Sequence, residues 1–152
     1  PIFPRWELPG YGMARMSCDT VLTTMLFEAA SAYLVSARAG FDPKNPAIAH
    51  SHAARAHRGL VVSGDRFVST SAESALLRQA LGAAGHEVLA VEMEGAAVAQ
   101  VCRDYGLPFA AVRTISDRAD DSAHVDFPHF VCNVASRYAD HIIQGLLQSL
   151  SK

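Results

Sequence analysis

The chain has 152 residues, half of them hydrophobic, which suits one domain with a buried core. Its formal net charge is −2, and its 13 basic and 15 acidic residues are spread along the chain, so it offers neither a basic stripe for nucleic acid nor a polybasic patch for a membrane surface. A small-molecule partner fits better. No apolar stretch reaches the roughly 20 residues of a membrane helix, and we expect a soluble, unsecreted protein.

The cysteines and histidines give no sign of a metal site. Cys18, Cys102 and Cys132 are odd in number and far apart, unlike a disulfide framework or the paired ligands of zinc. Three histidines between positions 50 and 57 are loosely spaced, with no cysteine or acidic residue among them. We therefore predict no metal and no cofactor, and a reduced cytoplasm as the location.

The opening segment, residues 1–15, carries three prolines and two glycines among bulky apolar side chains, which predicts an irregular loop. An apolar loop either contacts a partner or ligand or packs against its own chain, and both readings stay open. The chain begins at Pro1 without a capped element and offers three parallel-strand candidates, fewer than the five or six of an average sheet. We therefore expect part of a longer protein, with a sheet incomplete at the N-terminus.

Helical spacing and short apolar runs alternate along the rest of the chain. The predicted order is helix from 19 or 20 to near 40, strand 59–63, helix 71–84, strand 87–93, helix 95–105, strand 109–115 and helix 128–150. Apolar runs without alternation indicate strands buried on both faces. The fold class is therefore α/β, a single domain over 1–152 with three α/β/α layers and a mainly parallel sheet.

Two of these strands stop on a carboxylate. Glu94 follows the second strand and Asp117 follows the third, while Phe67 lies beyond the end of the first. The right-handed crossover rule makes the strands parallel, so their carboxyl ends share the edge where α/β sheets bind ligands. Glu94 could instead only favour a helix dipole, and Asp117 could only cap a loop.

Three motifs in register carry a resemblance to a known family. The segments Leu60–Val68, Val91–Ala97 and Val112–Asp117 resemble the 5′-methylthioadenosine/S-adenosylhomocysteine nucleosidases, within the nucleoside phosphorylase family. The likeness covers nearly all of the chain and implies a phosphorylase/hydrolase-like fold. It also implies hydrolysis of the N-glycosidic bond of 5′-thio-substituted adenosines to adenine and a thioribose. The alternatives are a purine nucleoside phosphorylase that uses phosphate and a non-catalytic nucleoside-binding fragment.

The resemblance implies different roles for the acidic residues. Asp117 would donate a proton to adenine N7, a general-acid step, with Ser116 helping to hold it. Glu94 would accept hydrogen bonds from the ribose hydroxyls, since an ionised carboxylate is a strong acceptor. Glu92 would act either catalytically, near the water, or in support. Arg113 is expected to pair with one of these acids.

Apolar residues complete the implied site. Phe67 would stack on adenine and the Val68 backbone would meet the base edge. Met93 would pack against the sugar, and Phe127 would be either a lid aromatic or a core residue. The same resemblance implies that the 1–15 loop reaches across a homodimer into the neighbour's 5′-alkylthio pocket. The candidate contact residues are Pro9 and Phe3.

Part of the family pattern has no match here. The family's amino-terminal half holds the glutamate that activates water and a glycine-rich loop near the sugar, and this sequence contains neither. We therefore expect these 152 residues to carry half of an active site and to be inactive alone.

Overall fold

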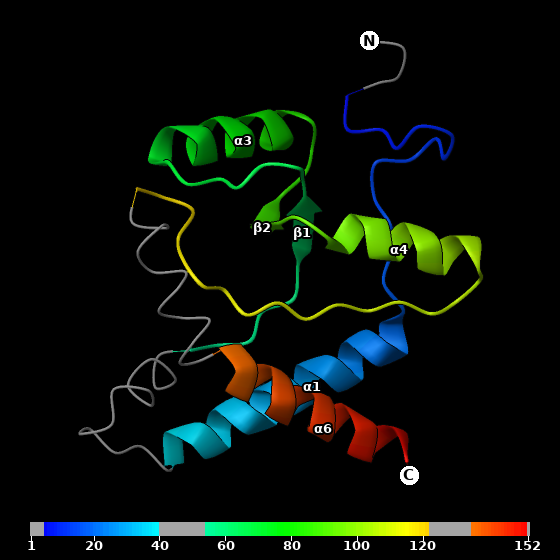
Figure 1. Cartoon of the computed structure of the whole chain (residues 1–152), viewed down its shortest axis with the longest axis vertical. Coiled ribbons are helices and arrows are strands. Elements are labelled where there is room, and N and C mark those ends of the chain that lie inside the picture. The colour runs from blue at the N-terminus through cyan, green and yellow to red at the C-terminus, as the bar shows by residue number, and fades with distance from the viewer. Residues whose placement is uncertain (1–4, 40–53, 122–134, 152) are drawn as a thin grey trace.

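The computed structural model describes residues 5–39, 54–121 and 135–151. Helices and strands alternate from α1 to α4 within these ranges, as the sequence predicts (Figure 1). The elements are α1 (Thr20–Ala39), β1 (Leu60–Ser63), α3 (Ser71–Ala83), β2 (Val88–Glu92), α4 (Gly95–Asp104) and α6 (Ser136–Leu150). The prediction that the last helix begins near residue 128 falls partly outside the described residues.

Side-chain caps set the starts of two helices. Asp19 caps α1, because its Oδ1 accepts a hydrogen bond from the backbone N–H of Leu22 at 2.8 Å. Thr70 caps α3, where its Oγ1 accepts from the backbone N–H of Glu73 at 3.2 Å. Each cap satisfies an amide of the first turn that has no partner inside the helix. These caps explain why both helices begin within a residue of the predicted position.

The strands β1 and β2 pair in parallel, joined by a crossover through α3, and this confirms the predicted α/β class. The register opposes Ser63 to Glu92, so the carboxyl ends of the two strands meet at one edge. Cover of the sheet is only partial, however, since Val61 is 41% exposed and Leu89 is 57% exposed. The prediction of strands buried on both faces is thus met only in part.

The prediction of a third strand at 109–115 is wrong for the described structure. This segment is extended and runs back across the molecule from the end of α4, but it contains no ladder-bonded strand (Figure 1). Its Phe109 carbonyl accepts a hydrogen bond from the backbone N–H of Asp19, and Ala110 packs against the cluster between α1 and α6. An apolar run predicts burial but does not specify a hydrogen-bonding partner, and here only its start contacts the helices, whereas Val112 and Ile115 are exposed.

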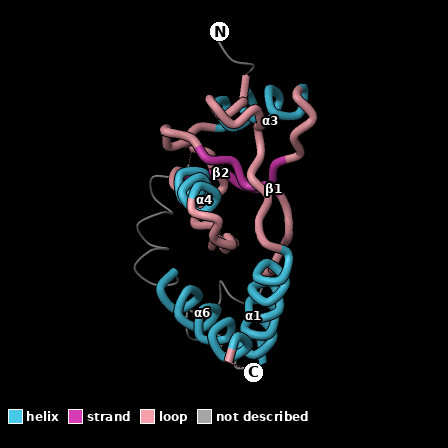
Figure 2. The backbone as a smooth tube through the Cα atoms, turned by 90° about the vertical axis from the view of Figure 1, so that its right-hand side faces the viewer, coloured by secondary structure: helices cyan, strands magenta, loops and turns pink. Residues whose placement is uncertain are grey.

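The helices α1 and α6 pack against each other away from the strands (Figure 2). Leu26 and Ala30 of α1 form a buried cluster with Ile142 of α6. By length and composition alone the window Thr20–Ala37, with mean hydropathy 1.3, could cross a membrane, which revises the expectation that no such stretch exists. The core helix of a globular protein passes the same test, and α1 contributes Leu26 and Ala30 to the cluster with α6.

The opening segment is held by its own chain. The Tyr11 hydroxyl donates to Oδ1 of Asp104 at 2.6 Å, at the end of α4. Arg15 donates from Nη2 to the carbonyl of Gly85 at 2.7 Å, in the turn between α3 and β2. These contacts support the reading that the loop packs on its own domain, and its role in a dimer stays a prediction.

Candidate functional site

A cluster of charged groups occupies the edge where β1 and β2 end. We call it the carboxylate corner and define it by these residues: Ser63, Glu92, Glu94, Gly95 and Arg113. The paired strand ends place Ser63 beside Glu92, and the Ser63 hydroxyl donates to Oε1 of Glu92. Three segments far apart in sequence therefore meet here: the end of β1, the β2–α4 junction and the 109–115 segment.

The first turn of α4 is capped by two side chains from outside the helix. Oε2 of Glu92 accepts from the backbone N–H of Gly95 at 2.8 Å and from that of Glu94 at 3.1 Å. Oγ of Ser63 accepts from the backbone N–H of Ala96 at 2.8 Å. Anionic or polar acceptors at this end also complement the helix dipole. Glu94 occupies the N-cap position but makes no side-chain cap bond, so its carboxylate is not used by the helix.

Arg113 links the two acids of the corner. Its Nη2 donates to Oε2 of Glu92 and, at 3.1 Å, to Oε2 of Glu94. Sequence analysis expected Arg113 to pair with one acid, and the structure pairs it with two. The segment that carries Arg113 therefore lies beside the end of β2 even though it forms no strand.

Glu92 is held in its ionised form. Burial by itself raises the pKa of Glu92, but the hydrogen bonds from Ser63 and from the N–H groups of Gly95 and Glu94, with the charge of Arg113, outweigh it. The pKa of Glu92 therefore lies below its ordinary value. The Glu92 side chain is only 11% exposed, whereas that of Glu94 is 68% exposed. The less exposed acid, Glu92, is thus committed to the fold, and the exposed Glu94 is open to a ligand.

Asp117 lies in a separate turn after the 109–115 segment. Its Oδ2 accepts from the Ser116 hydroxyl at 2.6 Å, and its Oδ1 accepts from the backbone N–H of Ala119 at 2.8 Å. Asp117 and Ser116 are both half-buried. Ser116 therefore contacts Asp117 as the sequence predicts. Since Asp117 is four residues from Arg113, the two Cα atoms lie within about 14 Å of each other.

The Asp117 turn is tethered to the start of α3. The Ser71 hydroxyl donates to Oδ2 of Asp121 at 2.7 Å. Phe67 and Val68 lie in the loop just before α3, so the tether joins the Phe67 loop and the Asp117 turn at one end of the helix. Phe67 is 40% exposed and Val68 is half-buried.

The remaining predicted residues are less informative. Met93 is 43% exposed beside Glu94, and Pro9 is exposed in the opening loop. Phe3 and Phe127 lie outside the described residues. Ser63 was not singled out from the sequence, although its place at the end of the strand paired with Glu92 is a signal that strand alignment could have found.

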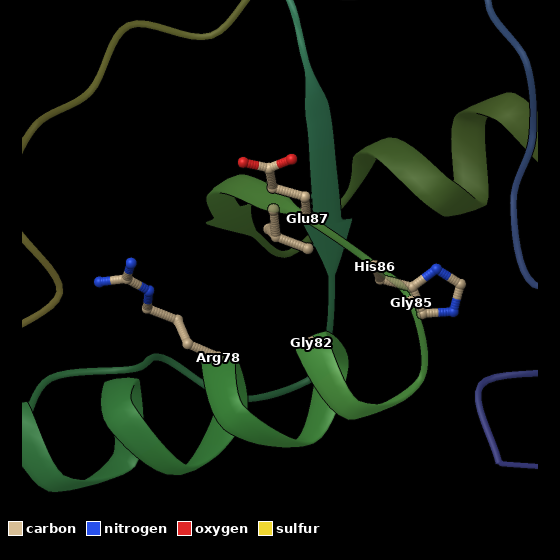
Figure 3. A pocket seen from close by; sticks show the side chains of 6 residues that line it. Arg78, Gly82, Gly85, His86 and Glu87 are labelled. Atoms are coloured by element: carbon tan, nitrogen blue, oxygen red, sulfur yellow. The ribbon is translucent and has the colours of Figure 1, made fainter.

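A depression of about 340 Å³ lies at the opposite end of β2 (Figure 3). It is lined by Arg78, Gly82, Gly85, His86, Glu87 and Val88. Because Val88 begins β2 and Glu92 ends it, this depression is separate from the carboxylate corner. It contains none of the residues that the sequence predicts for the site.

Comparisons with known proteins identify the family and the fold. The sequence profile described as the Phosphorylase superfamily matches residues 11–148. The chain is similar to the 5′-methylthioadenosine/S-adenosylhomocysteine nucleosidase of Neisseria meningitidis in complex with methylthio-immucillin-A. The identity is 31% and the TM-score 0.72, covering 94% of this chain and 52% of that one.

Two further structures are similar. The S-adenosylhomocysteine nucleosidase of Streptococcus pyogenes, in complex with 5-methylthiotubericidin, is 26% identical with a TM-score of 0.72, covering 97% of this chain and 52% of that one. The futalosine hydrolase of Helicobacter pylori, at 23% identity and a TM-score of 0.62, shares the fold over 91% of this chain and 50% of its own. The chain thus spans about half the length of these structures. The resemblance drawn from the three motifs is confirmed at the level of the family.

Proposed function

Because the chain belongs to the phosphorylase superfamily, we propose that its protein hydrolyses the N-glycosidic bond of 5′-methylthioadenosine or S-adenosylhomocysteine, releasing adenine and a thioribose. The observation that carries this proposal is the exposed carboxylate of Glu94, which α4 does not use as a cap and which Arg113 contacts at 3.1 Å. The nucleosidase structures similar to this chain support the substrate class, since both are complexes with compounds named for a methylthio group.

Glu94 binds the ribose in this proposal. An ionised carboxylate can accept hydrogen bonds from two neighbouring hydroxyl groups, one on each oxygen. Hydrogen bonds to a sugar hydroxyl strengthen as positive charge develops on the ring in an oxocarbenium-like transition state. Glu94 therefore contributes to the rate as well as to binding. Its neighbour Met93, also exposed, offers an apolar contact to the sugar.

Asp117 is the general acid of the proposed reaction. The C1′–N9 bond breaks with its electron pair going to adenine, and the Asp117 carboxylic acid delivers a proton to N7. Water then adds to C1′ and releases a proton. A hydroxyl both donates and accepts, so Ser116, at 2.6 Å, can hydrogen-bond Asp117 in either protonation state. Phe67 stacks on the departing base, next to the Val68 backbone, and Phe127 covers the pocket.

We also propose that the active species is a cytoplasmic homodimer in which residues 1–15 contact the neighbour's 5′-alkylthio pocket. Pro9 and Phe3 are the proposed contacts, and the exposure of Pro9 supports this. The Tyr11 and Arg15 hydrogen bonds would fix the direction from which the loop leaves its own domain. The test is the molar mass in solution by light scattering, together with KM for 5′-methylthioadenosine in Pro9→Asp. A monomer with full activity would refute the shared pocket.

Adenine release decides the main proposal. The full-length protein is incubated with 5′-methylthioadenosine, with and without inorganic phosphate, and adenine and the sugar product are separated by chromatography. We expect adenine and free thioribose at the same rate in both mixtures. Turnover that requires phosphate and yields a sugar phosphate would assign the phosphorylase reaction instead. Binding of the nucleoside without turnover would leave only a binding protein.

A further inference from the structure

We propose that Glu92 is a positioning residue, which acts through Arg113 to place Glu94 and touches neither the substrate nor the attacking water. This inference rests on the proposed function and deepens it. From the sequence, both a catalytic and a supporting role were open for Glu92. The contacts within the carboxylate corner distinguish the two.

The first argument is that the acceptor sites of Glu92 are occupied. An ionised carboxylate offers about four lone-pair sites. Oε1 accepts from the Ser63 hydroxyl and from the N–H of Gly95 at 2.9 Å. Oε2 accepts from Arg113, from the same Gly95 N–H at 2.8 Å and from the Glu94 N–H at 3.1 Å. A water molecule that needed Glu92 as a base would have to displace one of these donors.

The pKa of Glu92 also speaks against a role as general base. A general base works best when its pKa lies near the operating pH, which for a carboxyl group requires an upward shift. The hydrogen bonds and the Arg113 charge instead lower the pKa of Glu92. Glu92 is therefore ionised but a poor proton acceptor, as suits a fixed anchor.

The third argument links Glu92 to Glu94. The same Nη2 atom of Arg113 contacts both carboxylates. The Arg113–Glu94 pair is half exposed, and pairs of this kind contribute little because ordering two long side chains costs entropy. The less exposed Glu92 supplies the fixed point that holds Arg113 in place. Without it, the position of the guanidinium beside Glu94 would no longer be defined.

The test is Glu92→Gln in the full-length protein. Glutamine keeps the shape of glutamate, and its oxygen can still accept a hydrogen bond from Ser63. Its NH₂ group, however, replaces the oxygen that accepted hydrogen bonds from Arg113 and from the Glu94 N–H, so donor faces donor and these two bonds are lost. We expect kcat to fall about 10- to 100-fold, as when reacting groups are misplaced by about 1 Å. The acidic limb of the pH–rate profile should stay where it is. In an Arg113→Lys background, Glu92→Gln should cause no further loss, because both changes break the same link.

The matched control is Glu73→Gln. Glu73 also pairs with an arginine, Arg66 at 2.7 Å, and also lies near a helix N-terminus, in the first turn of α3, but outside the carboxylate corner. Its kcat should stay within about twofold, the size expected of a surface change. If Glu92→Gln fails to fold, Ser63→Ala tests the same anchor by removing one donor, and a loss of about 2- to 10-fold is expected.

Three results would overturn the inference. Loss of the acidic limb of the pH–rate profile in Glu92→Gln would show that Glu92 acts as a base. Additive losses in kcat in the Glu92→Gln/Arg113→Lys variant would show that Glu92 acts independently of Arg113. Unchanged kcat would remove it from the site. If the wild-type protein releases no adenine, the proposed function fails, and the link is then judged by urea unfolding of the two single variants and the double variant. Additive shifts in the unfolding midpoint would refute the link as well.

Discussion

The carboxylate corner and the Asp117 turn supply acids to one proposed site, but they are built differently. In the corner, the hydrogen bonds between segments join residues 19 to 33 positions apart in sequence. Asp117 instead bonds to the preceding residue, Ser116, and to Ala119, two residues further on. The corner can form only when three segments have come together, whereas the Asp117 turn needs few residues beyond its own.

This difference separates structural from chemical roles. Replacing a residue that joins distant segments should affect stability and activity together. Replacing a residue in a local turn should affect activity with little change in stability. The experiments below test this contrast, from the largest expected effect to the smallest.

The largest effect is expected at the local turn. Asp117→Asn should lower the rate of adenine release by about 10²–10⁴-fold, because the amide cannot donate the proton that a general acid supplies. Affinity for a methylthio-substituted inhibitor, measured by calorimetry, should be largely retained, as should the melting temperature.

The control for this experiment is Asp140→Asn, since Asp140 lies on α6, where it accepts a hydrogen bond from Gln144 at 2.9 Å, outside both the proposed site and the opening loop. It should keep the wild-type rate. A wild-type rate in Asp117→Asn would remove Asp117 from the mechanism.

The next effect is on the stability of the corner. A Cβ atom on Gly95 would lie 2.9 Å from Oε1 of Glu92, closer than real Cβ contacts allow, so Gly95→Ala must displace the carboxylate. We expect a loss of about 1–3 kcal/mol in unfolding free energy, as for other overpacked sites, and a fall in kcat with it.

Gly82→Ala in α3 is the matched control for the corner. A Cβ atom there would meet nothing within 4 Å, and alanine favours a helix by up to about 1 kcal/mol over glycine. Urea unfolding of both variants measures the two changes in unfolding free energy. Equal stability of Gly95→Ala and wild type would mean that the corner is loosely packed.

A smaller effect should appear in the pH dependence of stability. Because the pKa of Glu92 is lowered in the folded state, its ionised form stabilises the protein above the unfolded value near 4.5. That stabilisation is lost as the pH falls through the lower, folded value. The difference in unfolding free energy between wild type and Glu92→Gln should therefore be larger at pH 7 than at pH 3.

Ser63→Ala, which removes the hydroxyl bonds to Glu92 and to the Ala96 N–H but keeps the charge of Glu92, should retain part of this pH dependence. A difference between wild type and Glu92→Gln that does not change with pH would show that Glu92 is not held as an anion by the fold.

The sequence allowed much of this structure to be predicted, for reasons that the contrast explains. Helix starts such as Asp19 depend on local capping, and the β1–β2 pairing follows from two apolar runs and one crossover helix. Whether 109–115 forms a strand depends on a partner that no local pattern specifies. The exposure of Leu89 depends on which elements cover the sheet, and no local sequence pattern predicts this either.

The candidate site divides in the same way. That Ser116 holds Asp117 was implied by the family resemblance, and the bond joins two adjacent residues. The roles of Ser63 and of the double contact of Arg113 could not be predicted, because both depend on the alignment of segments in space. Distinguishing Glu92 from Glu94 likewise required the structure, since only burial and bonding separate two acids placed two residues apart.

The smallest expected effect tests the tether of the Asp117 turn. Ser71→Ala removes the exposed hydrogen bond to Asp121 at 2.7 Å, which should cost no more than about 1 kcal/mol in unfolding free energy. If the turn relies on this tether to place Asp117, kcat should fall by a few-fold, a larger relative effect than the change in stability. Ser149→Ala removes a comparable hydroxyl bond, to the Gly145 carbonyl at 3.0 Å in α6, and should leave kcat unchanged. Equal kcat in the two variants would show that the Asp117 turn holds its geometry without α3, and would make the contrast with the carboxylate corner sharper still.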